Sequence, residues 1–107
     1  MERLADDVSW KVTGTTRYSK TYQGNQSIVN DLVGPLFSML ADQYTHTAER
    51  FIAEDDYVVV ESQGKVNTKA GLPYNNKCCW VCRFENGKIK ELTEYMDTHL
   101  VVTALGG

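Results

Sequence analysis

The 107-residue sequence contains only two prolines and three cysteines, and it has no long apolar run. The longest such run, Cys78-Cys79-Trp80-Val81-Cys82, is far too short to cross a bilayer, so no membrane contact is expected. Basic residues are also not in excess: the sequence has 11 lysines and arginines and 14 aspartates and glutamates. Phosphate contacts require a basic face, so this balance argues against binding nucleic acid or an anionic membrane.

The few cysteines exclude a disulfide framework, because their number is odd and they occupy only five positions. Cys79 and Cys82 match the C-x-x-C pattern of redox and zinc sites. The surrounding residues indicate a strand, however, in which positions i and i+3 point to opposite faces. We therefore interpret the cysteines as packing residues, and we expect no metal and no cofactor.

No secretion signal opens the chain, which predicts a cytoplasmic protein. The composition, 42% hydrophobic and 23% charged, is typical of a folded soluble protein. A chain of this length forms one core, so residues 1–107 are expected to be a single domain.

Apolar spacing predicts a single convincing helix. Residues 4–7 resemble the tail of another helix, while residues 8–13 and 21–23 are predicted strands. Asn25 or Ser27 can cap the main helix, whose apolar positions recur at helical spacing: Ile28, Leu32, Leu36, Met39 and Leu40. Pro35 is expected to bend or split this helix.

The second half of the chain is predicted to be β-structure. Strands are expected at residues 45–52, 57–68, 74–84 and 88–101, and Asn86-Gly87 is a strong hairpin signal. One helix followed by an antiparallel meander predicts an α+β fold, with the helix across one face of a curved sheet.

Three segments resemble one known family. They are Leu-Ala-Asp-Asp-Val-Ser-Trp-Lys-Val-Thr-Gly (4–14), Ile-Ala-Glu-Asp-Asp-Tyr-Val-Val-Val-Glu (52–61) and Gly-Lys-Ile-Lys-Glu-Leu-Thr-Glu-Tyr-Met-Asp-Thr (87–98). Together with the linking residues 68–76, they resemble the SnoaL-like, ketosteroid-isomerase-related branch of the nuclear-transport-factor-2-like superfamily. This resemblance implies a cone-shaped bent antiparallel sheet around one long helix, with an apolar pocket at its open end, and it favours a homodimer formed through the sheet.

Members of this branch usually carry one or two helices before the first of these segments. The chain begins almost on that segment, so we expect these N-terminal helices to be short or missing. The cone is then either open or covered by a partner chain.

The resemblance implies several possible reactions, and the sequence retains the catalytic residues of these reactions to different extents. The base of ketosteroid isomerases falls at Val12, which cannot accept a proton. Epoxide-hydrolase relatives hold a water with an aspartate–arginine–aspartate set. Here Ser62 and Gly64 occupy the positions of the arginine and of one aspartate, and only the last acid has a counterpart, Glu94. SnoaL-type cyclases carry a late-strand acid that matches either Glu94 or Asp97. These two are the candidate catalytic residues.

The hairpin register decides which acid faces the pocket. With a two-residue turn, Trp80 lies opposite Thr93, and Tyr95 and Asp97 point inward. With a three-residue loop and a bulge, the register slips by one residue and Glu94 points inward. The family comparison favours Glu94, whose pKa would be raised in an apolar cone. The alternative is that Glu94 pairs with a basic residue or lies in a dimer contact.

Strand alternation predicts which other residues line the pocket. The candidate ligand-binding residues are Trp10, Val12, Tyr22, Val60, Ser62, Cys78, Trp80, Tyr95 and Met96. Such residues also form ordinary protein cores. We expect binding of a small hydrophobic molecule, with cofactor-free isomerase, cyclase or dehydratase chemistry as an extension. The alternative is a non-catalytic dimerisation or interaction module that uses its sheet face.

Overall fold

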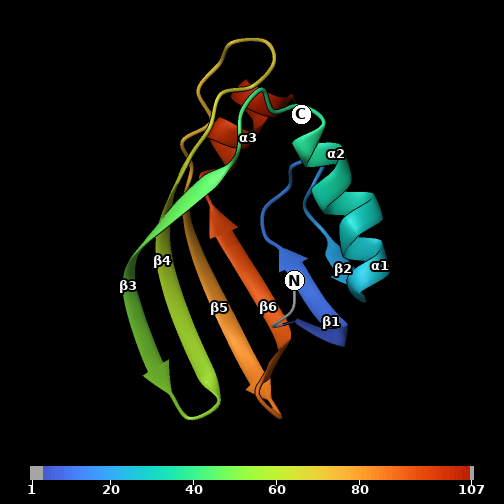
Figure 1. The fold of residues 1–107 in the computed structure, drawn as a ribbon, viewed down its shortest axis with the longest axis vertical. Coiled ribbons are helices and arrows are strands. Elements are labelled where there is room, and N and C mark those ends of the chain that lie inside the picture. Colours follow the sequence, from blue (N-terminus) through green and yellow to red (C-terminus); the bar gives the residue numbers. More distant parts are fainter. Residues whose placement is uncertain (1–3, 107) are drawn as a thin grey trace.

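The computed structural model describes residues 4–106 and contains one six-stranded sheet with the order β2-β1-β6-β5-β4-β3. The strands are β1 (Leu4–Val12), β2 (Thr21–Gln23), β3 (Thr45–Glu54), β4 (Tyr57–Lys65), β5 (Lys77–Glu85) and β6 (Lys88–Met96). Strands β3 to β6 form the expected antiparallel meander (Figure 1). The sheet as a whole is mixed, because β1 pairs with β6 in parallel.

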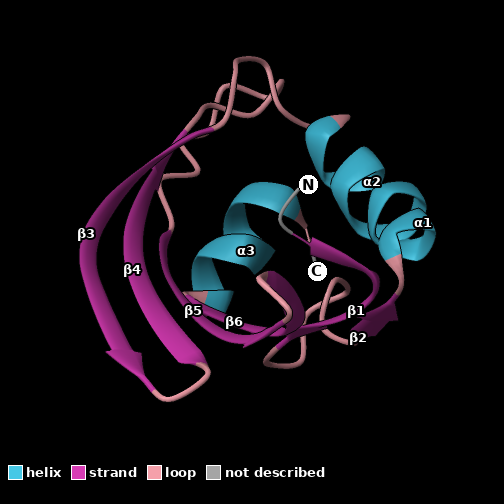
Figure 2. Cartoon of the chain, turned by 60° about the horizontal axis from the view of Figure 1, so that its bottom comes forward, coloured by secondary structure: helices cyan, strands magenta, loops and turns pink. Residues whose placement is uncertain are grey.

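The sheet is strongly curved and not closed, and helices lie against its concave side (Figure 2). We call this side, which carries Trp10, Trp80 and Glu94, the inner face, and the opposite side the outer face. The C-terminal helix α3 (Thr98–Leu105) lies within the curve, and the helical segment of residues 25–37 lies across from the sheet. The α+β class and the overall arrangement expected from the sequence are confirmed.

The helical segment is short and irregular rather than one long helix. It consists of α1 (Asn25–Ser27), the π-helix η1 (Ile28–Val33) and α2 (Gly34–Phe37). Its N-cap is Gly24, not Asn25 or Ser27. The backbone N–H of Gly34 donates to the carbonyl of Val29, five residues back, and Pro35 has no N–H to continue an α-helical ladder. The segment is thus divided into short pieces, with Pro35 in the first turn of α2, which agrees with the expected split of the helix.

Two sequence predictions at the chain ends were wrong. Residues 4–7 belong to strand β1, not to a helix, because the spacing of four between Leu4 and Val8 suits one face of a strand as well as a helix. The strand predicted to reach residue 101 ends at Met96. The side chain of Asp97 then accepts a hydrogen bond from the Leu100 N–H at 3.2 Å and caps α3.

The β5–β6 hairpin combines a tight turn with a bulge. Asn86 and Gly87 both have positive φ angles, 54° and 78°, and form the predicted two-residue turn. Lys90 is then an extra residue in β6, because Phe84 pairs with Ile89 while Arg83 pairs with Glu91. Trp80 consequently pairs with Glu94, a register that neither sequence alternative contained.

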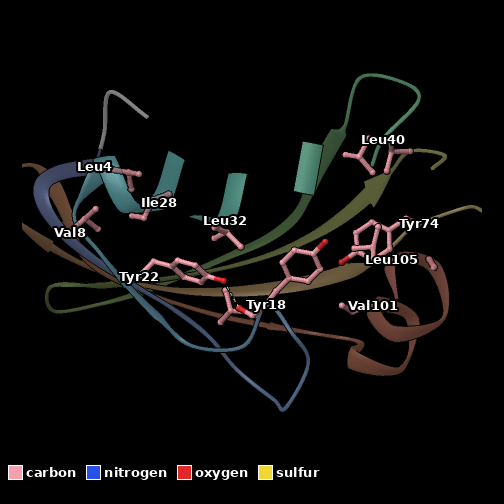
Figure 3. Close-up of a cluster of buried hydrophobic side chains, with 13 residues drawn as sticks. Leu4, Val8, Tyr18, Tyr22, Ile28, Leu32, Leu40, Tyr74, Val101 and Leu105 are labelled. Carbon is pink, nitrogen blue, oxygen red and sulfur yellow. Dashed lines mark hydrogen bonds between the residues drawn. The ribbon is translucent and has the colours of Figure 1, made fainter. Parts of the chain in front are cut away.

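The core lies between the inner face and the helical segment, and it continues to α3 (Figure 3). Val8 and Ile28 are fully buried at one end, while Tyr74 and Leu105 pack at the other. Between them, the Tyr22 hydroxyl donates to the Tyr18 carbonyl at 2.7 Å. Among residues 4–106, no helix is long and apolar enough to cross a membrane.

Candidate functional site

A cavity of about 360 Å³ lies among the inner face, the helical segment and α3. Apolar and aromatic side chains make up most of its wall, which is typical of small-molecule sites. The lining residues are Trp10, Val12, Thr16, Tyr18, Leu32, Val33, Leu36, Phe37, Tyr44, His46, Tyr74, Trp80, Glu94, Met96, Val101 and Leu105. Glu94 is the only aspartate, glutamate, lysine or arginine in this set.

Glu94 is a half-buried acid whose carboxyl has no countercharge in the described part of the chain. The Trp10 indole N–H donates to Glu94 Oε1 at 3.2 Å. Burial raises the pKa of the Glu94 carboxyl above its ordinary value, and nearby donors oppose the rise without cancelling it. Two basic residues of the neighbouring strand β5 are engaged elsewhere, since Lys77 pairs with Glu49, and Arg83 pairs with Glu85 and Glu91.

Two further groups lie close to this carboxyl. The Trp80 indole N–H lowers the pKa of Glu94, but it makes no complete hydrogen bond and is a buried donor without a partner among the described residues. The Cys78 thiol is buried beside the same carboxyl, and burial together with the acid raises its pKa to about 12. A thiol with this pKa is protonated at neutral pH and is a poor nucleophile.

A continuous row of aromatic rings forms one wall of the cavity. The Tyr44 ring contacts Phe37, His46 and Tyr74, with centroid distances of 6.4, 4.4 and 5.9 Å. The His46 ring lies 5.0 Å from that of Trp80 and extends the row toward Glu94. Adjacent rings are inclined by 37° to 64°, so they present both faces and edges.

Gly64 allows this row to lie against the sheet. A Cβ atom at position 64 would lie 2.7 Å from Tyr44 Cε1, which is closer than real contacts allow, and 3.1 Å from His46 Cε1, which is tighter than most. Gly64 pairs with His46 across β3 and β4, directly beneath these rings. The absence of a side chain at this position therefore makes room for the aromatic wall.

The titratable rings in the wall are held in their neutral forms. Burial lowers the pKa of His46, whose Nδ1 lies 3.4 Å from the hydroxyl of the fully buried Ser62. Burial raises the pKa of Tyr44 and Tyr74, and the Glu94 carboxylate contributes to both shifts. None of these three residues was among the ligand-binding residues proposed from the sequence. Tyr44 and Tyr74 lie outside the regular strands, where strand alternation makes no prediction.

Asn76 fixes the end of the cavity near α3. Its fully buried amide donates to the Tyr74 hydroxyl at 3.3 Å and to the Asp97 carbonyl at 3.1 Å, and its Oδ1 accepts from the Asp97 N–H at 2.9 Å. Val101 and Leu105 of α3 then line the cavity. One side chain thus connects a lining tyrosine to the start of a lining helix.

The structure divides the residues proposed from the sequence into two groups. Those that line the cavity are Trp10, Val12, Trp80, Glu94 and Met96. Val60, Ser62 and Cys78 share the inner face but lie outside the lining set, and Tyr22 is buried in the core.

Tyr95 and Asp97 do not point into the cavity. Tyr95 pairs with Cys79 on the outer face and is 50% exposed, whereas Asp97 caps α3. The bulge at Lys90 explains this outcome, because it shifts the register that had placed both residues inward. Within residues 4–106, no group of His, Cys, Asp and Glu side chains has the arrangement of a metal site.

A curved α+β sheet that holds an apolar cavity on its inner face is the architecture of the NTF2-like class. Within that class, the chain belongs to the SnoaL-like domain family, whose family model matches residues 1–92. A comparison with curated proteins finds no match.

Solved structures agree with this assignment. An NTF2-like protein of unknown function from Burkholderia pseudomallei has a TM-score of 0.85 and 21% identity, over 99% of this chain and 82% of that one. A putative SnoaL-like polyketide cyclase from Jannaschia has a TM-score of 0.81 and 15% identity, over 99% and 75%. TerC, co-crystallised with polyporic acid, has a TM-score of 0.83 and 19% identity, over 98% and 82%. At these identities the likeness shows the fold.

Proposed function

We propose that this SnoaL-like domain binds a small hydrophobic molecule in its cavity and that Glu94 transfers a proton to or from it without a cofactor. The observation that carries the proposal is the Glu94 carboxyl, a half-buried acid without a countercharge in a mostly apolar wall. An acid whose pKa is raised toward neutrality is suited to both giving and accepting protons. Support also comes from the likeness to the putative SnoaL-like polyketide cyclase from Jannaschia.

The reaction class follows from the groups around Glu94. In its ionised form, the carboxylate can remove a proton from a carbon next to a carbonyl group and return it at another position. The Trp10 N–H holds the carboxyl in place at 3.2 Å. This chemistry fits an isomerisation, a cyclisation or a dehydration.

Hydrogen–deuterium exchange tests this function without knowledge of the product. Cyclic ketones and polyketide-like compounds are incubated in D₂O, and loss of the α-proton signal is followed by NMR. We expect the wild type to accelerate exchange for at least one compound that binds, and Glu94→Gln to abolish the acceleration. Glu91→Gln is the matched control, because Glu91 is an exposed acid of the same strand. Equal rates with wild type and Glu94→Gln would contradict proton transfer by Glu94.

A second candidate function, dimerisation through the outer face, is favoured by an apolar patch there. Ile52 and Tyr57 are exposed, and together with Val59 and Val81 they line a shallow hollow. The ion pairs Arg50–Glu61 and Arg83–Glu91 lie on the same face. An apolar centre with a charged rim has the composition of a protein interface.

A further inference from the structure

We propose that the preferred ligand of the cavity is a hydrophobic cation, such as an amine or quaternary ammonium compound, bound between the aromatic wall and Glu94. This inference rests on the proposed binding function and adds the chemical class of the ligand. Two independent features of the cavity carry it: the sign of its only formal charge and the density of its aromatic rings.

The charge feature is the isolation of Glu94. No lysine or arginine lines the cavity among the described residues, and Glu94 makes no ion pair there. An uncompensated carboxylate in apolar surroundings is costly, and a ligand cation would offset that cost. An anionic ligand would instead face a charge of its own sign, without a basic residue to receive it.

The aromatic feature is the ring row from Phe37 through Tyr44 and His46 to Trp80, with Trp10 beside Glu94. Ring faces attract cations through their quadrupoles, and cages of such rings are a known means of binding quaternary ammonium groups. All of these rings belong to residues that line the cavity, so a bound cation would lie among them. Arg17 already lies 5.0 Å from the Tyr18 ring at the edge of the cavity, but it is not a lining residue.

Binding of a cation should depend on pH in a defined direction. The titratable groups that face or adjoin Glu94 are Cys78, Tyr44, Tyr74 and His46. Cys78 and both tyrosines remain neutral at pH 5–8. Deprotonation of Glu94 beside a neutral His46 ring gives the most negative cavity. Affinity for a cation should therefore rise with pH.

The test compares benzyltrimethylammonium with neopentylbenzene, in which carbon replaces the charged nitrogen, and with benzoate. Trp10 and Trp80 are the only tryptophans of the chain and both line the cavity, so quenching of intrinsic fluorescence reports binding. We expect the cation to bind wild type about tenfold more tightly than its neutral isostere at pH 8, a difference of about 1.4 kcal/mol, which is within the range of cation–π contacts. Benzoate should bind most weakly.

Two variants and one control separate the contribution of the Glu94 charge from that of the aromatic wall. Glu94→Gln should reduce the preference for the cation to about twofold, whereas Glu91→Gln should leave it unchanged. Tyr44→Leu should weaken binding of the cation more than that of the isostere. Near-ultraviolet circular dichroism confirms that each variant is folded. If the isostere binds as tightly as the cation, the inference is wrong while the apolar binding function stands. If neither compound binds at millimolar concentration, both the cation preference and the proposed binding function are wrong.

Discussion

At the scale of single residues, the chemistry of the cavity depends on how the sequence isolates one carboxyl. Strand alternation and the bulge at Lys90 turn Glu94 inward, and the neighbouring acids lie elsewhere. The donors around Glu94 are the uncharged indole N–H groups and a thiol. Because such donors stabilise a carboxylate less than a cation does, burial dominates and the pKa of Glu94 rises.

The isolation of Glu94 leads to a prediction about how folding stability depends on pH. The pKa of Glu94 is raised in the folded state, so the folded chain binds more protons than the unfolded chain at pH values above the ordinary 4.5. The contribution of Glu94 to stability therefore falls as the pH rises from 4.5 through the folded-state pKa. We expect Glu94→Gln to remove this loss and to be more stable than wild type at pH 7.

Urea denaturation at several pH values checks this expectation. The advantage of Glu94→Gln over wild type should shrink as the pH is lowered toward 4.5, and Glu54→Gln, a change at an exposed acid of β3 outside the cavity, is the control. An advantage that grows on acidification would show that Glu94 is stabilised by an ion pair.

At the scale of elements, Asn76 joins strand β5 to α3 by way of the Asp97 backbone. Replacing Asn76 with Ala removes three hydrogen bonds of a fully buried side chain and leaves their partners unsatisfied. We expect a loss of roughly 2–4 kcal/mol in the free energy of unfolding, with faster amide exchange in α3. Asn75→Ala is the matched control, because the exposed Asn75 side chain accepts one bond, from the Val66 N–H, and should lose about 1 kcal/mol. Similar losses from the two variants would contradict the role of Asn76.

Gly64 provides a second test at this scale. Gly64→Ala places a methyl group where the Tyr44 ring lies, so the ring must move. We expect a destabilisation of roughly 1–3 kcal/mol, the usual cost of overpacking, together with altered ring-current shifts at His46 in NMR spectra. Unchanged His46 shifts would mean that the aromatic wall does not rest on position 64.

The elements show how far sequence reasoning reaches. Turn chemistry at Asn86-Gly87 and the strands of the meander were predictable, because they depend on local residue types. The bulge at Lys90 was not predictable, because no local signal in the sequence distinguishes an extra strand residue from a regular one. Helix α3 was missed because its apolar, β-branched residues 98–105 suit a strand equally well, and the Asp97 cap was interpreted as a pocket acid.

The candidate site was predictable only in part for the same reason. Residues on regular strands, such as Trp10, Trp80 and Glu94, follow from alternation once the register is known. Tyr44, Tyr74 and the helix residues reach the cavity through tertiary packing, which alternation along one strand does not describe. The aromatic wall, and with it the expected preference for cations, therefore emerged only from the structure.

At the scale of the whole molecule, the outer face of the sheet predicts self-association. Ile52 and Tyr57 leave large apolar surfaces exposed around Val59 and Val81. We expect light scattering at micromolar concentration to report a dimer, and Val81→Lys to shift it toward monomer without unfolding. Lys65→Glu, a change at an exposed position outside the hollow, serves as the control. A wild-type monomer at this concentration would contradict the interface.

The most direct test of the account is the pKa of Glu94, measured by carbon-detected NMR titration with Glu94→Gln to assign the signal. We expect a value clearly above 4.5, and a further rise in Trp10→Phe, which removes the indole donor. A value at or below 4.5 would show that Glu94 is solvated or paired with a cation. Its isolation in the cavity, and the functions built on that isolation, would then be wrong.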